Sequence, residues 1–107
     1  MIVTTTATIA GRRIVNTLGL VRGSTIRARH LGRDIMAIFR AMVGGEIHEY
    51  SKMLAESREQ AIDRMVQEAE SLGANAVVCV RFQTSMIMAG AAEILCYGTA
   101  VVVEPDV

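Results

Sequence analysis

The sequence has few aromatic residues, little proline, few cysteines and no net charge. Only 4% of its 107 residues are aromatic and none is Trp. A hydrophobic core therefore has to be built from Val, Ile, Leu, Ala and the seven Met. The 11 basic and 11 acidic residues balance. This balance argues against a nucleic-acid partner, because nucleic-acid-binding proteins gain affinity by neutralising phosphates.

Long hydrophobic runs are absent as well. No apolar stretch approaches the roughly 20 residues that a membrane-spanning helix needs. The first residues have neither the basic start nor the apolar centre of a signal peptide. We therefore expect a cytoplasmic protein without a membrane partner. In that reducing compartment Cys79 and Cys96 are expected to be free thiols.

What the sequence does have is ample aliphatic content in a chain of ordinary domain size. Residues 1–107 are interpreted as a single domain. A chain of this length buries roughly 65% of the surface that its unfolded state exposes, enough for a core without disulfides. The hydrophobic fraction is 51% and the mean hydropathy is +0.36. Such a fraction in so small a domain leaves apolar surface for a partner subunit.

The first half of the chain indicates extended segments and a short helix. Residues 3–9 are rich in Thr and β-branched side chains, and residues 14–29 predict one long strand with bends at Gly19 and Gly23. Helical spacing over residues 32–42 predicts a short helix, which Gly44 and Gly45 end. The second part of the long strand has two unequal faces, one with Leu20, Arg22, Ser24, Ile26 and Ala28 and the other with Val21, Gly23, Thr25, Arg27 and Arg29.

A long amphipathic helix is predicted for residues 47–72, and two strands follow it. Gly73 is suited to the left-handed conformation that ends a helix. The β-branched run behind it predicts a strand over residues 74–88, and a second strand over residues 91–103 follows a turn near residues 89–90. The apolar stripe of the helix consists of Tyr50, Met53, Leu54, Ala61, Ile62, Met65, Val66, Ala69 and Leu72.

The order strand, helix, strand, strand defines the predicted α+β fold. With a right-handed crossover, the strands at residues 14–29 and 74–88 run parallel, and the last strand inserts antiparallel between them. One long helix then packs on a small mixed sheet. The other face of the sheet is predicted to have no cover from its own chain.

Both faces of this sheet are predicted to be mostly apolar. Alternation along residues 74–88 gives one face with Val78, Val80 and Phe82 and another with Val77, Cys79 and Arg81. Val101 is expected on an apolar face where a charge would prevent assembly. Because a bare apolar sheet face would aggregate, we expect it to meet copies of the same chain in a closed ring.

Ligand-type side chains are present but scattered. No CxxC, CxC or HxxxH spacing occurs, whereas structural zinc sites use ligands at short paired spacings. A two-residue turn at residues 89–90 would place Cys79 opposite Ala100 and Cys96 opposite Gln83, too far out of register for a disulfide. Met86 and Met88 share a face and could bind copper(I), although Met is also an ordinary core filler. The remaining ligand-type residues considered are His30, His48, Glu46 and Glu49.

Phosphate binding and catalysis have equally little support in the sequence. Gly44 and Gly45 precede the long helix and could hold an anion, but GxGxxG and GK[ST] fingerprints are missing. No nucleophile elbow or Cys–His signature occurs, and Glu93 and Glu104 have the positions of edge and tail charges. We therefore assign no catalytic, cofactor-binding or metal residue and expect no cofactor.

Several motifs occur in a recognisable order and spacing, namely Gly44-Gly45, Glu49-Tyr50, Arg58, Ala61, Glu68-Ala69, residues 72–78, Arg81-Phe82 and residues 97–101. In this order and spacing they resemble the YbjQ-like family of small bacterial and archaeal proteins. The resemblance implies a dodecin-like β-α-β-β subunit that assembles as a ring-shaped homopentamer. The family carries a heavy-metal-binding label and has no established biochemical role. Two departures are Glu46, where the family often has a basic residue, and Cys79, where glycine is common.

Two functional hypotheses follow. The first is a non-enzymatic homo-oligomeric module of unknown biochemical function, a pentamer according to the resemblance. The alternative is a metal- or small-ligand-binding protein whose site lies between subunits, where single Cys, His or Glu residues from several chains could converge.

Overall fold

The computed structural model describes residues 1–28, 48–88 and 91–107. Four strands form one sheet in the order β1–β3–β4–β2, with β1 parallel to β3 and with β4 antiparallel to both of its neighbours. The predicted α+β topology is confirmed, because β4 lies between two long parallel strands. The short helix predicted for residues 32–42 lies outside the described residues. The elements are β1 (Ile2–Val3), β2 (Arg12–Ala28), α2 (His48–Ser71), β3 (Ala76–Met88) and β4 (Ala91–Pro105).

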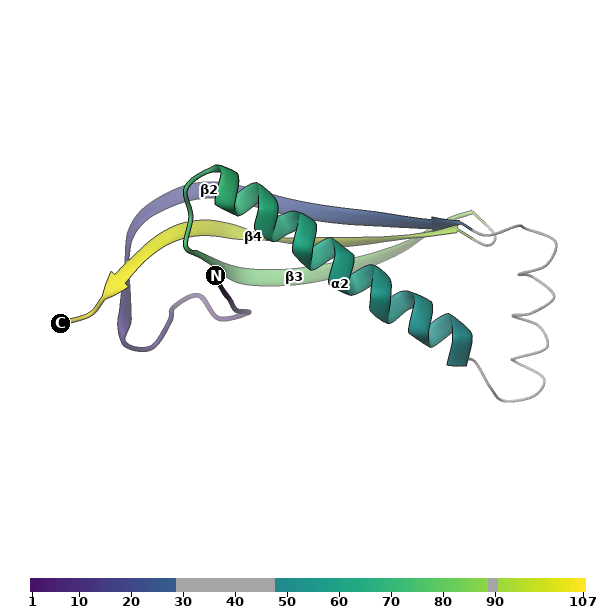
Figure 1. The fold of residues 1–107 in the computed structure, drawn as a ribbon, viewed down its shortest axis with the longest axis horizontal. Helices are drawn as coiled ribbons and strands as arrows, with labels where there is room; N and C mark the ends of the chain where they lie inside the picture. The colour runs from purple at the N-terminus through teal and green to yellow at the C-terminus, as the bar shows by residue number, and fades with distance from the viewer. Residues whose placement is uncertain (29–47, 89–90) are drawn as a thin grey trace.

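Helix α2 crosses one face of the sheet obliquely (Figure 1). Ala61, Met65 and Ala69, at steps of four, are fully buried against the sheet. The helix follows β2 closely, since the Thr25 hydroxyl donates a 3.1 Å hydrogen bond to the Ser57 carbonyl oxygen. The faces predicted for this part of β2 are confirmed: Val21 and Thr25 are buried towards α2, while Leu20 and Ile26 are exposed.

The helix ends as its sequence predicts. Gly73 has φ +88°, its N–H bonds the Glu70 carbonyl at 3.0 Å, and the Ala74 N–H bonds the Ala69 carbonyl at 3.0 Å. This pair of bonds is a Schellman motif, which satisfies carbonyls that a helix end leaves free. The chain then turns directly into β3. The Asn75 side chain bonds the Val103 backbone as a neighbouring strand would: its Nδ2 donates to the Val103 carbonyl oxygen at 2.9 Å, and its Oδ1 accepts from the Val103 N–H at 2.8 Å.

The hairpin of β3 and β4 corrects the predicted register. Met88 pairs with Ala91, as a two-residue turn requires, but the pairing shifts between Met86 and Met88 and again between Val78 and Arg81. Cys96 therefore pairs with Phe82 rather than with Gln83, and Ala100 pairs with Val77 rather than with Cys79. Cys79 has φ +56°, a left-handed conformation that identifies the second shift as a β-bulge. Bulges add residues that simple alternation does not reveal.

The bulge at Cys79 also corrects the predicted faces of β3. Val77 and Val80 both join the core beneath α2, whereas Val78 belongs to a second cluster on the opposite face. The prediction that Val78 and Val80 share a face is therefore wrong. An extra residue in a strand inverts the facing of every side chain beyond it.

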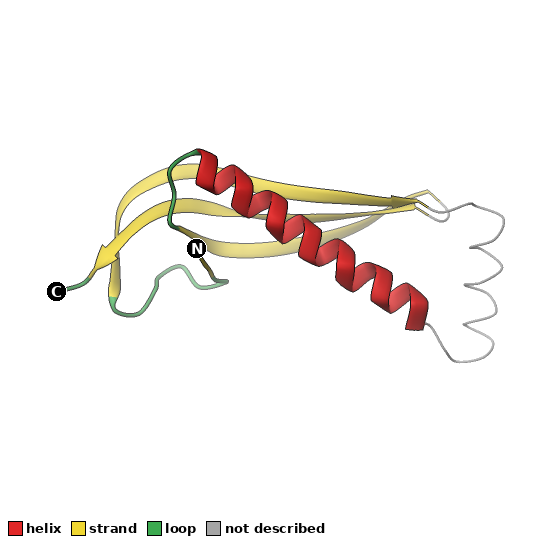
Figure 2. Cartoon of the chain, in the orientation of Figure 1, coloured by secondary structure: helices red, strands yellow, loops and turns green. Residues whose placement is uncertain are grey.

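The sheet face opposite α2, which we call the open face, is partly covered by its own chain. Near β1, Ala76, Val78, Val101 and Val103 are buried, and Ile2 and Ile9 pack against them. The loop between β1 and β2 lies at this end of the sheet (Figure 2). The prediction of a face without intrachain cover is wrong here, because a loop rich in Thr and β-branched residues folds back over it.

The remainder of the open face is more polar than predicted. The register sets three rows of side chains across β2, β4 and β3, and each row contains polar groups. Because the bulge moves Val80 and Phe82 to the helix side, this part of the open face is no continuous apolar layer. The rows are Arg22–Tyr97–Arg81, Ser24–Leu95–Gln83 and Ile26–Glu93–Ser85.

Candidate functional site

Among the candidate metal ligands whose side chains the structure describes, Cys79, Cys96 and Met86 do not form a common site. Cys79 and Cys96 are both free thiols, as predicted; Cys96 is buried, and Cys79 is half-buried at the bulge. Met86 is 74% exposed. Within residues 1–28, 48–88 and 91–107, no three or more His, Cys, Asp and Glu residues form a group that could hold a metal. His48, Glu49 and Met88 lie at ends of α2 and β3, whereas His30, Gly44, Gly45 and Glu46 lie outside the described residues.

Cys96 is a core residue whose thiol is shielded from solvent. Its Sγ atom lies 3.5 Å from the Met65 Sδ atom beneath α2, and burial raises its pKa above the ordinary value of 9.0. A raised pKa means less thiolate, which is the reactive form of cysteine. Cys96 therefore contributes packing rather than nucleophilic chemistry.

Because burial raises the pKa of Cys96, the free energy of unfolding is expected to fall at alkaline pH. The folded state holds the Cys96 proton more tightly than the unfolded state, so the stabilisation is complete below about pH 9 and is lost as the pH rises towards the higher folded pKa. Between the unfolded and the folded pKa, the free energy of unfolding should fall by up to about 1.4 kcal/mol per pH unit. Urea unfolding between pH 8 and 10.5 measures it. A Cys96→Ala variant should lose this part of the slope, and an unchanged slope would contradict the assignment.

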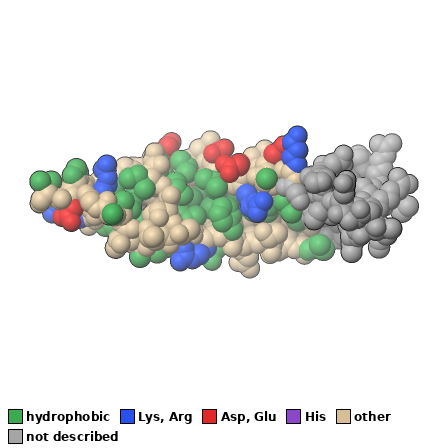
Figure 3. Space-filling model, turned by 90° about the horizontal axis from the view of Figure 1, so that it is seen from below, with side chains coloured by type: hydrophobic (Ala, Val, Ile, Leu, Met, Phe, Trp, Pro, Cys, Tyr) green, Lys and Arg blue, Asp and Glu red, His purple; other side chains and the backbone are tan. Residues whose placement is uncertain are grey.

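Exposed apolar side chains concentrate on the two long edge strands. On β2, Leu20 and Ile26 are 64% and 61% exposed, and on β3, Ile87 is 50% exposed. Phe82 is also exposed, on the helix side of β3. A space-filling view from the lower side of Figure 1 shows hydrophobic side chains gathered along the middle of the molecule, between charged groups (Figure 3). Exposed apolar surface of this kind marks interaction sites.

Both edge strands also leave backbone groups without a partner in the described part of the chain. There, β2 pairs with β4 only, along Arg12–Ala28. On β3, β1 and the loop after it bond residues 76–80, through contacts such as the 3.0 Å bond from the Val80 N–H to the Thr4 carbonyl. Residues 81–88 of β3 have β4 on one side and no described strand on the other. We call these two features the β2 edge and the β3 edge.

The hydrogen-bond pattern identifies which backbone groups point outward. Because the Val80 N–H points away from β4, strand alternation turns the N–H groups of Phe82, Thr84 and Met86 outward too. The same reasoning applies to β2. Leu95 on β4 lies opposite both Gln83 on β3 and Ser24 on β2, and its backbone groups point towards β3. The N–H and carbonyl groups of Ser24 therefore point away from β4. An independent contact agrees: the Arg64 guanidinium reaches from α2 and donates a 2.5 Å hydrogen bond to the Ser24 carbonyl.

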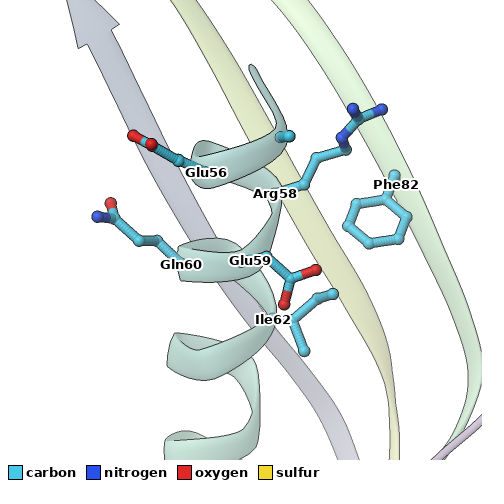
Figure 4. A pocket seen from close by; sticks show the side chains of 7 residues that line it. Glu56, Arg58, Glu59, Gln60, Ile62 and Phe82 are labelled. Carbon is cyan, nitrogen blue, oxygen red and sulfur yellow. The ribbon is translucent and has the colours of Figure 1, made fainter. Parts of the chain in front are cut away.

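A groove runs between α2 and β3 because the helix lies over β2 and β4. Its volume is about 760 Å³, and its apolar lining comes from Ala55, Ile62 and Phe82. The close-up shows Arg58, Glu59, Ile62 and Phe82 on the β3 side of the helix, whereas Glu56 and Gln60 point to the other side (Figure 4). Glu56 and Gln60 are also part of the lining, so the groove has an apolar centre beside one basic and two acidic side chains.

These features make up a surface suited to association with another molecule. The sequence revealed part of it: the face of β2 with Leu20 and Ile26 was predicted from alternation. The β3 edge and the groove at Phe82 were missed, because the bulge that turns Phe82 to the helix side has no signature in alternation. Only the structure reveals this bulge, through the positive φ of Cys79.

The fold defines a small α+β protein in which one helix packs on a mixed four-stranded sheet. A crystal structure of a protein of unknown function from Pediococcus pentosaceus, described as belonging to the DUF74 family, is similar to this chain. The TM-score is 0.71, the identity 16%, and the match covers 97% of this chain and 98% of that chain. This likeness supports the fold.

Sequence comparisons identify the family. The YbjQ family, described as "Putative heavy-metal-binding", matches residues 1–104. A UPF0145 protein from Methanosarcina acetivorans is 68% identical over 101 residues, which cover 94% of this chain and 95% of that protein. A UPF0145 protein from Archaeoglobus fulgidus is 55% identical over 101 residues, with 94% of each chain covered. The chain therefore belongs to the YbjQ-like family, as its motifs predicted, and the names of these relatives state no enzymatic activity.

One further property concerns membranes. None of the helices in the described part of the chain is both long and apolar enough to span a bilayer.

Proposed function

We propose that this protein is a non-enzymatic, one-domain module, residues 1–107, that works as a ring-shaped homo-oligomer of dodecin-like subunits. A pentamer is proposed because the family resemblance implies that number. The observation that carries the proposal is the combination, on the two edge strands, of exposed apolar side chains and of backbone groups that pair with no strand in the described part of the chain. Long exposed edges with apolar side chains are prone to pair with other chains, and a closed assembly uses them up.

Two sequence observations support the rest of this proposal. A non-enzymatic role fits a sequence without a nucleophile elbow or a Cys–His signature. A cytoplasmic location fits the two free thiols, Cys79 and Cys96, because oxidising compartments favour disulfides. The balanced charge supports an assembly without nucleic acid.

Native mass spectrometry together with sedimentation velocity at micromolar concentration tests the oligomer. We expect one closed species whose mass is a fixed multiple of the 11.6 kDa chain, five for the pentamer. The mass should not grow with concentration, since a closed ring has no free interface left. A soluble species of 11.6 kDa throughout the concentration range would contradict the proposal.

The alternative function is a metal- or small-ligand-binding protein with a site between subunits. The description of the family favours it. Because the described residues of one chain hold no group of three ligands, such a site would need side chains from several copies. Elemental analysis of the assembled protein, purified without chelator, separates the two functions: a stoichiometric metal that a Cys79→Ser variant lacks would favour the alternative.

A further inference from the structure

One row of side chains on the open face places an aromatic ring between two arginines. Arg22, Tyr97 and Arg81 lie side by side across β2, β4 and β3. We propose that this row binds a nucleoside monophosphate, with its phosphate held by Arg81 and its base stacked against Tyr97 and Arg22. The inference goes beyond the proposed function, because all three side chains belong to one chain and the site needs no second copy.

The register fixes the side of the sheet on which the row lies. A Cβ atom on Gly98, the residue after Tyr97, would meet Val77 and Val80, which belong to the core under α2. Tyr97 therefore points to the open face, and the residues paired with it point the same way. The two arginine Cα atoms are about 10 Å apart, because a close pair at Arg22 adds to a wide pair at Arg81.

Arg81 is held in place by the main chain rather than by an acid. Its Nη1 atom donates to the Thr5 carbonyl oxygen at 2.9 Å and to the Val80 carbonyl oxygen at 2.8 Å. These bonds leave the Nε and Nη2 donors of the guanidinium without a partner in the described part of the chain. Two neighbouring N–H donors of this kind fit two oxygens of one phosphate. The guanidinium is thus positioned in advance for an anion.

The positive charge of both arginines is not neutralised nearby. Among the described residues, only Arg13 and Glu104 form an ion pair. Along β4 the nearest acid to Tyr97 is Glu93, about 13 Å away at strand spacing. The loop at residues 4–11 contains no acid. The two adjoining rows contain none either; they are Leu20–Thr99–Val78 and Ser24–Leu95–Gln83. The row therefore carries two positive charges, which complement a phosphate monoester near neutral pH.

Tyr97 supplies a surface for an aromatic ring. It is half-buried in the middle of the sheet, and the exposed Arg22 is its neighbour in the closer type of antiparallel pair. A nucleobase stacks on such a ring, and the adjacent guanidinium adds a cation–π contact. Ser24 and Gln83 in the next row offer a hydroxyl and an amide to the sugar and to the edge of the base.

The size of the row favours one nucleotide over a nucleic-acid chain. A chain of nucleotides needs a basic groove that follows several phosphates. Here the positive charge is confined to one row, and Leu95 and Glu93 follow it along β4. The balanced charge of the whole protein points in the same direction.

Equilibrium dialysis with radiolabelled adenosine monophosphate tests the site. We expect the parent protein to bind this nucleotide with a dissociation constant below about 1 mM. Adenosine and inorganic phosphate should each bind at least about 10-fold more weakly, because each contacts only part of the row. Absence of nucleotide binding, or phosphate binding of equal strength, would overturn the inference. A single-stranded RNA hexamer that binds about 100-fold more tightly than the nucleotide would overturn it in favour of nucleic acid.

Substitutions within the row separate the two halves of the site. Arg81→Gln should weaken nucleotide binding about 10-fold or more, and Arg81→Lys should not restore it, because an ammonium group cannot make the two-pronged contact. Tyr97→Leu should weaken it about 5-fold or more, whereas Tyr97→Phe keeps the ring and the affinity. Arg12→Gln is the matched control: Arg12 is an exposed arginine at the start of β2, and its loss should leave the affinity unchanged.

Arg22→Gln keeps the test independent of folding. Arg81→Gln also removes the bonds to Thr5 and Val80, whereas Arg22→Gln removes no hydrogen bond or ion pair within the described residues. Circular dichroism checks the fold of each variant. An Arg22→Gln protein should bind the nucleotide about 5-fold more weakly, and one that folds and binds like the parent would contradict the site.

Sedimentation of the same samples keeps this inference apart from the proposed function. A monomer that binds the nucleotide would overturn the homo-oligomer and support the site. An assembled protein that binds no nucleotide would overturn the site and leave the homo-oligomer standing.

Discussion

Replacing Gly23 with valine is expected to destroy the packing of α2 on the sheet. A Cβ atom at this position would collide with the Ala61 carbonyl oxygen and lie 2.5 Å from the Met65 backbone nitrogen and 2.8 Å from the Arg64 Cβ atom. Two of these neighbours are backbone atoms of the helix, which cannot move aside as a side chain could. The helix as a whole would have to rise from β2, and the buried residues Ala61 and Met65 would lose their contacts.

Even Gly23→Ala should lower the free energy of unfolding by about 3 kcal/mol, the upper part of the range for overpacked sites. Such a loss corresponds to a decrease of roughly 15 °C in the midpoint of thermal unfolding. Gly23→Val should leave no cooperative transition, because whole domains of this kind have only about 5–15 kcal/mol of stability. Circular dichroism during heating measures both variants.

Gly11→Ala is the control for the Gly23 variants. Gly11 has φ +75°, but a Cβ atom there would meet no atom within 4 Å. Its substitution should cost only about 1 kcal/mol of backbone strain. If Gly11→Ala and Gly23→Ala had equal effects, close approach of the helix would not be the reason for glycine at position 23.

Val101→Asp is expected to destabilise the individual protomer. Val101 is 1% exposed, within the cluster of Ala76, Val78 and Val103 that Ile2 and Ile9 cover. A carboxylate there would be buried without a partner, at a cost of about 3–5 kcal/mol. The loop after β1 should separate from the sheet, and urea unfolding should show a lower midpoint.

The loss of stability in Val101→Asp should also depend on pH. Burial would raise the pKa of the new carboxyl group, so the variant should regain part of its stability as the pH falls and the carboxyl takes up a proton. Val107→Asp, at a fully exposed terminal residue, is the matched control and should change stability by less than about 0.5 kcal/mol. A Val101→Asp protomer as stable as this control would contradict the placement of Val101 in an intrachain core.

The fold could be predicted from the sequence because its local signals agree with one another. The helix stripe that includes Ala61, Met65 and Ala69, the stop at Gly73 and the β-branched strands around a short turn all indicate the same elements. With a right-handed crossover, β2 and β3 run parallel and β4 can insert antiparallel between them, which is where the structure has it.

The faces of the sheet could not be predicted in the same way. A β-bulge at Cys79 inverts the alternation beyond it, and its only local trace is a positive φ at a residue that is not glycine. The prediction that Val78, Val80 and Phe82 share one face was therefore wrong, because Val80 joins the core under α2 and Val78 the cluster on the open face. The cover that Ile2 and Ile9 provide was missed for a different reason, because contacts between a terminal loop and a distant strand leave no periodic pattern.

By itself, the sequence determined helix α2, the three long strands, their order and the place of β4 between β2 and β3, since periodicity and turn residues are properties of neighbouring residues. Only the tertiary structure decided which side chains lie under α2, which are covered by the loop after β1, and which edges stay open. Those outcomes depend on register between strands far apart in the chain, and a shift of one residue there reverses every face beyond it.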